Sequence, residues 1–161
     1  MDNILTILEK DARTTPEEIA RMTKKKVSSV KKIIKGHEKS GVIVKYKTVL
    51  NKEMLRIDAR EVRALIEVNI VPQKNVGFDY MAERIYKFPE VISCHLVSGT
   101  YDLLLIAGGK DLHTVANFVA EKLSPMQNVR GTTTHFLLKT YKEDGDILKQ
   151  VEKDRRIAIS L

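Results

Sequence analysis

The order of strand-like and helix-like patterns after residue 60 constrains the fold more than any other feature of this sequence. Four segments have the β-branched content or the alternation of strands, and two place apolar residues at helical spacing. In chain order they are 60–71 (strand), 76–88 (helix), 91–99 and 101–109 (strands), 111–124 (helix) and 129–142 (strand). A helix, a proline and a strand follow one another twice, which is a weak internal repeat. The pattern predicts an α+β fold of the ferredoxin-like βαββαβ type, with both helices on one face of the sheet.

The other face of such a sheet has no helix over it, and its apolar content favours a protein partner. The segment 101–109, YDLLLIAGG, is a nearly continuous apolar run, which is typical of a strand buried on both faces. We therefore expect the sheet to associate with a partner through this face.

The first fifty residues have a different pattern, that of three short helices followed by a strand. The helices are expected at about 2–11, 15–23 and 26–40. Thr15 and Pro16, with Glu18 three residues after Thr15, form the capping-box signature of a helix start. Gly41 fits the end of the third helix, and 42–50, VIVKYKTVL, alternates as a half-buried strand does. This order predicts a winged helix-turn-helix.

The excess positive charge of the chain lies in this first part. The formal net charge is +7; residues 1–60 hold 15 basic and 8 acidic residues, whereas residues 61–161 hold 13 of each. Such an asymmetry indicates two modules, of which the first faces DNA, RNA or anionic lipid. No apolar run approaches the roughly 20 residues of a membrane span. The single cysteine, Cys94, suits a protein of the reducing cytoplasm.

The third helix concentrates this charge on one side. At about 100° per residue, its apolar residues cluster opposite its lysines. The apolar set is Val27, Val30, Ile33 and Ile34, and the cationic set is Lys24, Lys25, Lys31, Lys32 and Lys35. No acid occurs between Lys24 and His37, so these lysines repel one another unless an anion binds them. A nucleic acid is favoured over a merely solvated face and over a membrane surface, for which the apolar side is short and lacks aromatic anchors.

In a helix-turn-helix the third helix enters the major groove, where lysines contact phosphates and serines near the helix start reach phosphates or bases. Two further lysines on one face of the following strand would contact the flanking backbone. The predicted DNA-binding residues are therefore Lys24, Lys25, Lys26, Ser28, Ser29, Lys31, Lys32, Lys35, Lys45 and Lys47.

The loop 97–102, VSGTYD, is the most distinctive connection in the second half of the chain. Gly99 would allow a backbone conformation that bulkier residues avoid, and a close approach of its amide to a ligand. Asp102 would be placed to hold an ammonium group, and hydroxyls follow at the start of the last strand, in 132–134. From the residues alone, a tight turn beside a solvated sheet edge explains the same pattern.

Taken together, residues 1 to about 142 resemble the Lrp/AsnC family of feast/famine transcription regulators. ILTILEKDARTTPEEIA and EKSGVIVKYKTVLN are similar to its opening helices and wing, and VSGTYDLLLIAGGKDLHTVANFV and NVRGTTTHFLLK to its effector domain. The resemblance implies a sequence-specific DNA-binding regulator whose dimers assemble into tetramers or octamers, with a small effector, often an amino acid, between dimers. It implies no other cofactor and no metal. It places the effector at Ser98, Gly99, Thr100, Tyr101, Asp102, Thr132, Thr133 and Thr134.

The expected domain boundaries follow from the same likeness. They are 1–50 for the DNA-binding domain, 51–60 for a linker, 61–142 for the effector and dimerisation domain, and 143–161 for a C-terminal extension. In the extension, Ile147, Leu148 and Val151 would form one side of a short helix, unless the segment is a frayed tail.

The third helix departs from the family pattern. Lys26 and Val27 stand where the family usually has Ser-Pro, and Ile33 and His37 where an arginine and a leucine are common. His37 lies on the apolar side of the helix, which indicates a packing residue or, alternatively, a pH-sensitive switch of DNA binding. These departures bear on the operator sequence and leave the mode of binding unchanged.

Two other functions stay open. His95 and His135 would approach each other if their strands were neighbours, and relatives of the family with this fold are haem-pathway decarboxylases that hold a tetrapyrrole with histidines. A sensor of amino acids that no longer binds DNA is the second alternative. No metalloprotease, nucleotide-binding or zinc motif is present in the sequence, so no enzyme and no catalytic residue is predicted.

Overall fold

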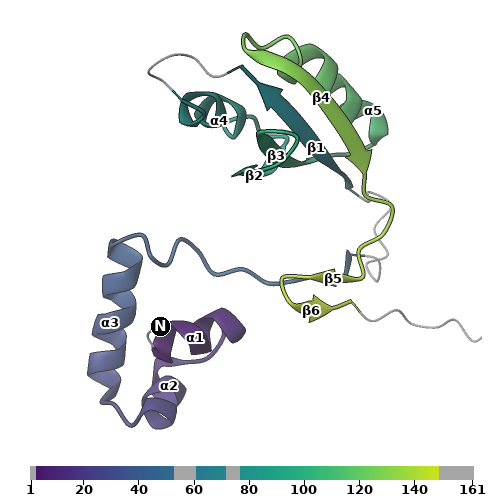
Figure 1. The fold of residues 1–161 in the computed structure, drawn as a ribbon. Helices are drawn as coiled ribbons and strands as arrows, with labels where there is room; N and C mark the ends of the chain where they lie inside the picture. The colour runs from purple at the N-terminus through teal and green to yellow at the C-terminus, as the bar shows by residue number, and fades with distance from the viewer. Residues whose placement is uncertain (1–2, 53–60, 72–76, 149–161) are drawn as a thin grey trace, which may run out of the picture. The chain divides into compact units, whose positions relative to one another are not determined.

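A computed structural model describes residues 3–52, 61–71 and 77–148. The chain divides after Leu50 into two compact units (Figure 1). Most of the predicted linker, residues 53–60, lies outside the described residues. Within the described part, no helix is long and apolar enough to cross a membrane.

Three helices form the first unit: α1 (Asn3–Lys10), α2 (Pro16–Thr23) and α3 (Val27–Lys39). All three contribute to one small core, whose buried members are Ile4, Leu8, Ile19, Ala20 and Val30. The predicted apolar side of α3 packs around this core, because Val27, Ile33 and Ile34 lie partly buried against it. The opposite side of α3 is therefore left to the surface.

The ends of α2 and α3 follow the sequence signals. The hydroxyl of Thr15 accepts a hydrogen bond from the amide of Glu18 at 3.3 Å, and the carboxylate of Glu18 accepts from the amide of Thr15 at 2.8 Å. α3 ends at Lys39, and Gly41 follows with φ +76°, in the left-handed region that favours glycine. The capping box and the glycine helix end are both confirmed.

The strand predicted for residues 42–50 is wrong for the single chain, since the described structure has no strand there. A strand needs a neighbour whose backbone groups complete its hydrogen bonds, and this segment has no such ladder within the described residues. Val44 is 85% exposed as a result.

A four-stranded antiparallel sheet in the order β2-β3-β1-β4 forms the base of the second unit. In chain order its elements are β1 (Val62–Ile70), α4 (Asp79–Ile85), β2 (Val91–Leu96), β3 (Leu103–Gly109), α5 (Leu112–Asn117), the π-helix η2 (Phe118–Leu123) and β4 (Val129–Phe136). Each helix connects two strands that are not neighbours, and both helices lie over the same face (Figure 1). The ferredoxin-like βαββαβ prediction is confirmed.

The second helix differs from its prediction in detail. Its start is as expected, because the carboxylate of Asp111 accepts from the amide of Thr114 at 2.7 Å. After Asn117 the helix widens into η2, where the amide of Ser124 donates to the carbonyl of Val119, five residues back, at 2.8 Å. The buried residues of this segment are Phe118 and Leu123, five positions apart, as the wider turn requires.

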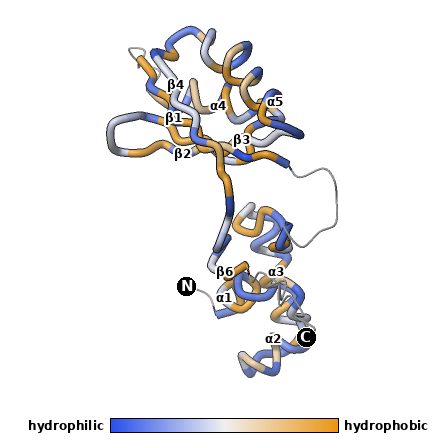
Figure 2. Tube along the Cα trace, turned by 90° about the vertical axis from the view of Figure 1, so that its right-hand side faces the viewer, coloured by the Kyte–Doolittle hydropathy of each residue, from blue (hydrophilic) through white to orange (hydrophobic). Residues whose placement is uncertain are grey.

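The main core lies between the sheet and the helices. Alternate residues of β1 and β3 are buried there: Ala64, Ile66, Val68, Ile70, Leu103, Leu105 and Ala107. Helical residues fill the space above them, and the rings of Phe88 and Phe118 meet edge to face with centroids 5.6 Å apart. Figure 2 shows the hydrophobic residues gathered along the strands of this sheet.

The other face of the sheet is only half covered within one chain. Leu65, Leu104 and Ile106 point to this side and are partly buried. Within one chain, β3 is fully buried on the helix side and partly buried on this side, so its burial on both faces stays a prediction for an assembly. The same face carries Glu67 and His135, whose Oε1 and Nε2 atoms are 3.2 Å apart.

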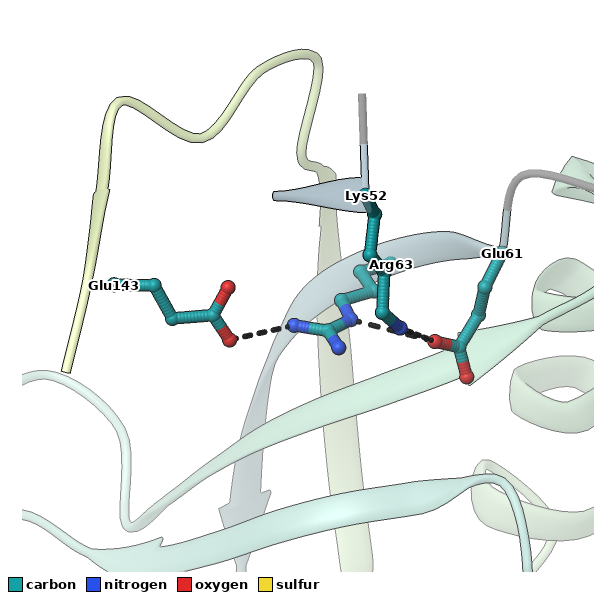
Figure 3. Close-up of polar contacts among 4 residues, drawn as sticks. All are labelled: Lys52, Glu61, Arg63 and Glu143. Carbon is teal, nitrogen blue, oxygen red and sulfur yellow. Dashed lines mark hydrogen bonds and ion pairs between the residues drawn. The ribbon is translucent and has the colours of Figure 1, made fainter. Parts of the chain in front are cut away.

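The chain continues beyond β4 into a short hairpin, β5 (Lys142–Glu143) and β6 (Asp146–Ile147). The helix predicted around Ile147 is wrong: Gly145, with φ +92°, makes a tight hairpin turn instead. Val151 lies outside the described residues. Ion pairs connect four residues of the second unit, which Figure 3 shows. Arg63 of β1 contacts Glu143 of the hairpin and Glu61, and Glu61 contacts Lys52.

Candidate nucleic-acid interface and ligand loop

The lysines of α3 lie on its exposed side. Lys31, Lys32 and Lys35 are exposed, and Val30 on the other side of the helix is fully buried. Lys39 was not among the predicted residues, although the helix reaches it and about 100° per residue places it on the same side. The helix therefore presents a row of ammonium groups with its back held in the core.

The turn between α2 and α3 carries three more lysines, and its backbone is unusual. Lys24 has φ 53° and ψ 34°, a left-handed conformation that costs a non-glycine residue roughly 1 kcal/mol. Lys26 precedes α3 without a hydrogen bond from its side chain to the helix. A glycine would suit the position of Lys24 better, so its side chain is a candidate for a role outside the fold.

Replacing Lys24 by Gly separates that role from stability. Relief of strain of roughly 1 kcal/mol is offset by the lost interaction of the ammonium with the α2 carboxyl end, about 0.3–1 kcal/mol. We expect the free energy of unfolding to stay equal or to rise slightly, and duplex affinity at 0.1 M salt to fall several-fold. Chemical denaturation and a DNA titration measure the two. Lys24→Asn, which also tolerates this conformation, should behave alike; unchanged affinity in both variants would contradict a DNA contact.

An acid from α2 reaches the lysine side of α3. Glu17 Oε1 lies 2.8 Å from Lys31 Nζ, and this hydrogen bond holds the pKa of Glu17 below its usual range. The lack of acids between Lys24 and His37 did not indicate this pair, because Glu17 lies in the preceding helix. Its position in the first turn of α2 is visible in the sequence, but its contact with Lys31 depends on how the two helices cross.

The other residues predicted to contact DNA are exposed as well, but they do not form a regular row as the lysines of α3 do. Ser28 and Ser29 lie exposed in the first turn of α3. Lys45 and Lys47 are exposed too, but the strand face they were expected to share is not formed. Around Gly36, an added Cβ would meet no described atom within 4 Å, and nothing in the described structure explains this mid-helix glycine.

In the second unit, Asp102 is tied to the backbone of β1. Its Oδ2 accepts a hydrogen bond from the amide of Ile70 at 2.7 Å, and its own amide donates to the carbonyl of Val68 at 3.1 Å. Oδ2 therefore has a structural partner, whereas no described residue has a hydrogen bond to Oδ1. Gly99 does not have a left-handed φ, and a Cβ there would meet no described atom. The unusual backbone conformation expected at Gly99 is therefore not found, and a close approach of its amide to a ligand stays a prediction.

The three threonines do not share a face. Thr132 and Thr134 pair with Val68 and Ile66, on the helix side of the sheet, whereas Thr133 pairs with Glu67 on the other side. Thr132 lies 3.2 Å, between hydroxyl oxygens, from Ser124 at the end of η2. The strand β1 separates Thr132 from the loop 97–102, and both lie at the same end of the sheet. The structure thus places Asp102 and Thr132 at the same end of the sheet, with β1 between them, and turns Thr133 to the other face.

The predicted approach of His95 and His135 is wrong. Their strands, β2 and β4, are the two edges of the sheet, with β3 and β1 between them. At about 4.8 Å per strand, they are roughly 14 Å apart across the sheet. No group of three or more metal-ligating side chains occurs among the described residues. The tetrapyrrole alternative loses the geometry that suggested it.

Comparison with known proteins agrees with both units. Residues 3–44 match the family described as winged helix-turn-helix DNA-binding, and residues 63–147 match the Lrp/AsnC ligand binding domain. The uncharacterized HTH-type transcriptional regulator YugG of Bacillus subtilis is 44% identical over 158 residues, which cover 98% of this chain and 94% of that protein. The HTH-type transcriptional regulator FL11 of Pyrococcus furiosus is 28% identical over 89% of this chain and 91% of its own. A Neisseria meningitidis transcriptional regulator, crystallised with L-Met, has a TM-score of 0.68 and 27% identity over 89% of this chain and 93% of its own.

Proposed function

The chain belongs to the Lrp/AsnC family of helix-turn-helix transcriptional regulators, and we propose that its first unit binds duplex DNA through the lysine side of α3. In this mode α3 lies in the major groove, and the turn at Lys24–Lys26 faces the sugar–phosphate backbone. Lysine ammonium groups neutralise phosphates, while Ser28 and Ser29 are placed at the helix start to contact phosphates or base edges.

The observation that carries this proposal is the two-sided character of α3. One side packs on α1 and α2 through Val30 and its neighbours, so the helix cannot turn its lysines inward. The other side holds Lys32 and Lys35 in solvent. Like charges this close destabilise a free helix, and binding of a polyanion removes that cost.

For the second unit we propose a small effector, an amino acid, at the end of the sheet formed by the loop 97–102 and the start of β4. Oδ1 of Asp102 would accept a hydrogen bond from the ammonium group, and the amides and hydroxyls of the loop would bind the carboxylate. The complex of the Neisseria relative with L-Met supports this class of ligand.

Assembly is part of the same proposal. The half-covered sheet face, with Leu65, Leu104 and Ile106, would pack on a second copy, and dimers would associate further around the effector. Residues 61–142 would then act as the effector and dimerisation domain, and residues 143–161 as a C-terminal extension. The protein would act in the cytoplasm, where the DNA is. Effector binding would shift the arrangement of dimers and hence the occupancy of DNA.

The salt dependence of DNA binding tests the proposal. If about six phosphates are neutralised, affinity for a duplex should fall roughly 10³-fold between 50 and 200 mM salt. Fluorescence anisotropy with a labelled random-sequence duplex measures this slope. An affinity that hardly changes over this range would favour the alternative, a sensor that does not bind DNA.

A further inference from the structure

One carboxylate of the first unit lies against the proposed DNA-binding side. Glu17 Oε1 is 2.8 Å from Lys31 Nζ, and the two side chains are 54% and 59% exposed. The pair therefore belongs to the surface and not to the core. This carboxylate carries a negative charge and binds the ammonium group of Lys31 in the way that a phosphate oxygen would.

The start of α2 does not depend on the contact between Glu17 and Lys31. The first turn of the helix is already capped by Thr15 and Glu18, which satisfy each other's amides. An acid at position 17 adds the general favourable interaction of a negative charge with a helix start. That interaction does not require its side chain to reach a lysine on the next helix.

We propose that Glu17 is an internal competitor for DNA phosphate at Lys31, and that it sets duplex affinity below the value the lysines alone would give. The inference rests on the proposed DNA-binding function. When a phosphate approaches, Lys31 must leave Glu17 or divide its hydrogen bonds between two anions, and the carboxylate repels the phosphate. Lys31 then contributes less than a full charge to counterion release.

The other residues near this pair do not take over the role of Glu17. Glu18 is engaged with the amide and hydroxyl of Thr15. Glu38 of α3 accepts a hydrogen bond from the hydroxyl of Tyr46 at 2.9 Å. Among the acids that the structure describes, Glu17 is the one with a direct contact to a lysine of α3.

The test compares Glu17→Gln with Glu9→Gln in the full-length chain. Glu9 is an exposed acid on α1, and its replacement removes the same charge from the same unit. For a random-sequence duplex at 0.1 M salt, we expect Glu17→Gln to bind roughly three- to eightfold more tightly. The slope of log affinity against log salt should become more negative by up to about 0.9. Glu9→Gln should stay within about twofold of wild type.

A structural role alone would change thermal unfolding and leave the salt slope as it was, so both are measured. Glu17→Ala, which cannot donate a new hydrogen bond to phosphate, should reproduce the gain of Glu17→Gln. Equal affinity in wild type and both Glu17 variants, or an equal gain in Glu9→Gln, would overturn the inference while leaving DNA binding intact. Failure of wild type and variants alike to bind duplex would overturn the proposed function itself.

Discussion

Replacement of Lys25, Lys32 and Lys35 by alanine should weaken duplex binding roughly 10²- to 10³-fold at 0.1 M salt. Each phosphate contact contributes about 0.9 log unit of affinity per tenfold change in salt, so three contacts give about 2.7. The loss should be nearly the same for operator and random sequences, because phosphates carry no sequence information. Lys31 is left in place so that its pair with Glu17 stays intact.

The control for this prediction removes the same charge elsewhere. Lys110, Lys139 and Lys142 are exposed in the second unit, and their triple alanine variant lowers the net charge equally. Anisotropy titrations of both variants at several salt concentrations distinguish the effect of where the lysines lie from the effect of the total charge. If the two triple variants lose affinity equally, the lysine side of α3 has no special part in binding. Because all three α3-side lysines are exposed, the folding of the variant should be close to wild type.

Features set by neighbouring residues could be predicted from the sequence. The capping box at Thr15 and Glu18 and the cap at Asp111 involve residues three positions apart, so the chain itself carries the whole signal. The βαββαβ order could be predicted because each strand and helix has its own apolar period, and right-handed crossovers leave few ways to connect them. The separation of α3 into an apolar and a cationic side followed from the helical repeat alone.

Features that depend on packing between distant segments could not be predicted. The pair of Glu17 and Lys31 needs the angle between two helices, and the bond of Asp102 to the amide of Ile70 joins residues 32 positions apart. The segment 42–50 has the pattern of a strand, but its pattern does not say which chain would pair with it. The orientation of Thr133 is different, because the two-residue period of a strand does predict that it points away from Thr132 and Thr134. Placing all three threonines in one site disregarded this period.

Asp102 offers the second large effect, since one side chain serves both the fold and the proposed ligand site. Asp102→Ala removes the acceptor of the Ile70 amide, and Ile70 is only 5% exposed. An unsatisfied buried amide costs about 1–3 kcal/mol, so this variant should lose stability of that order. Asp102→Asn keeps an oxygen that can accept the same hydrogen bond. It removes only the negative charge, and its free energy of unfolding should stay within about 1 kcal/mol of wild type.

The two variants therefore separate structure from ligand binding. A thermal-shift screen of the twenty amino acids on wild type, beginning with L-Met, identifies a ligand, and sedimentation shows its influence on oligomer size. The loss of one charged hydrogen bond to an ammonium group, worth about 1.5–3 kcal/mol, should weaken binding roughly 10- to 150-fold in Asp102→Asn. Glu121 is an exposed acid of the same unit, and the Glu121→Gln variant should respond as wild type does.

If Asp102→Asn also responds like wild type, Asp102 serves the backbone of β1 alone. If wild type responds to none of the twenty, an amino acid is not the effector. Because the asparagine variant keeps the contact with Ile70, loss of its response would locate the ammonium group at Oδ1 of Asp102.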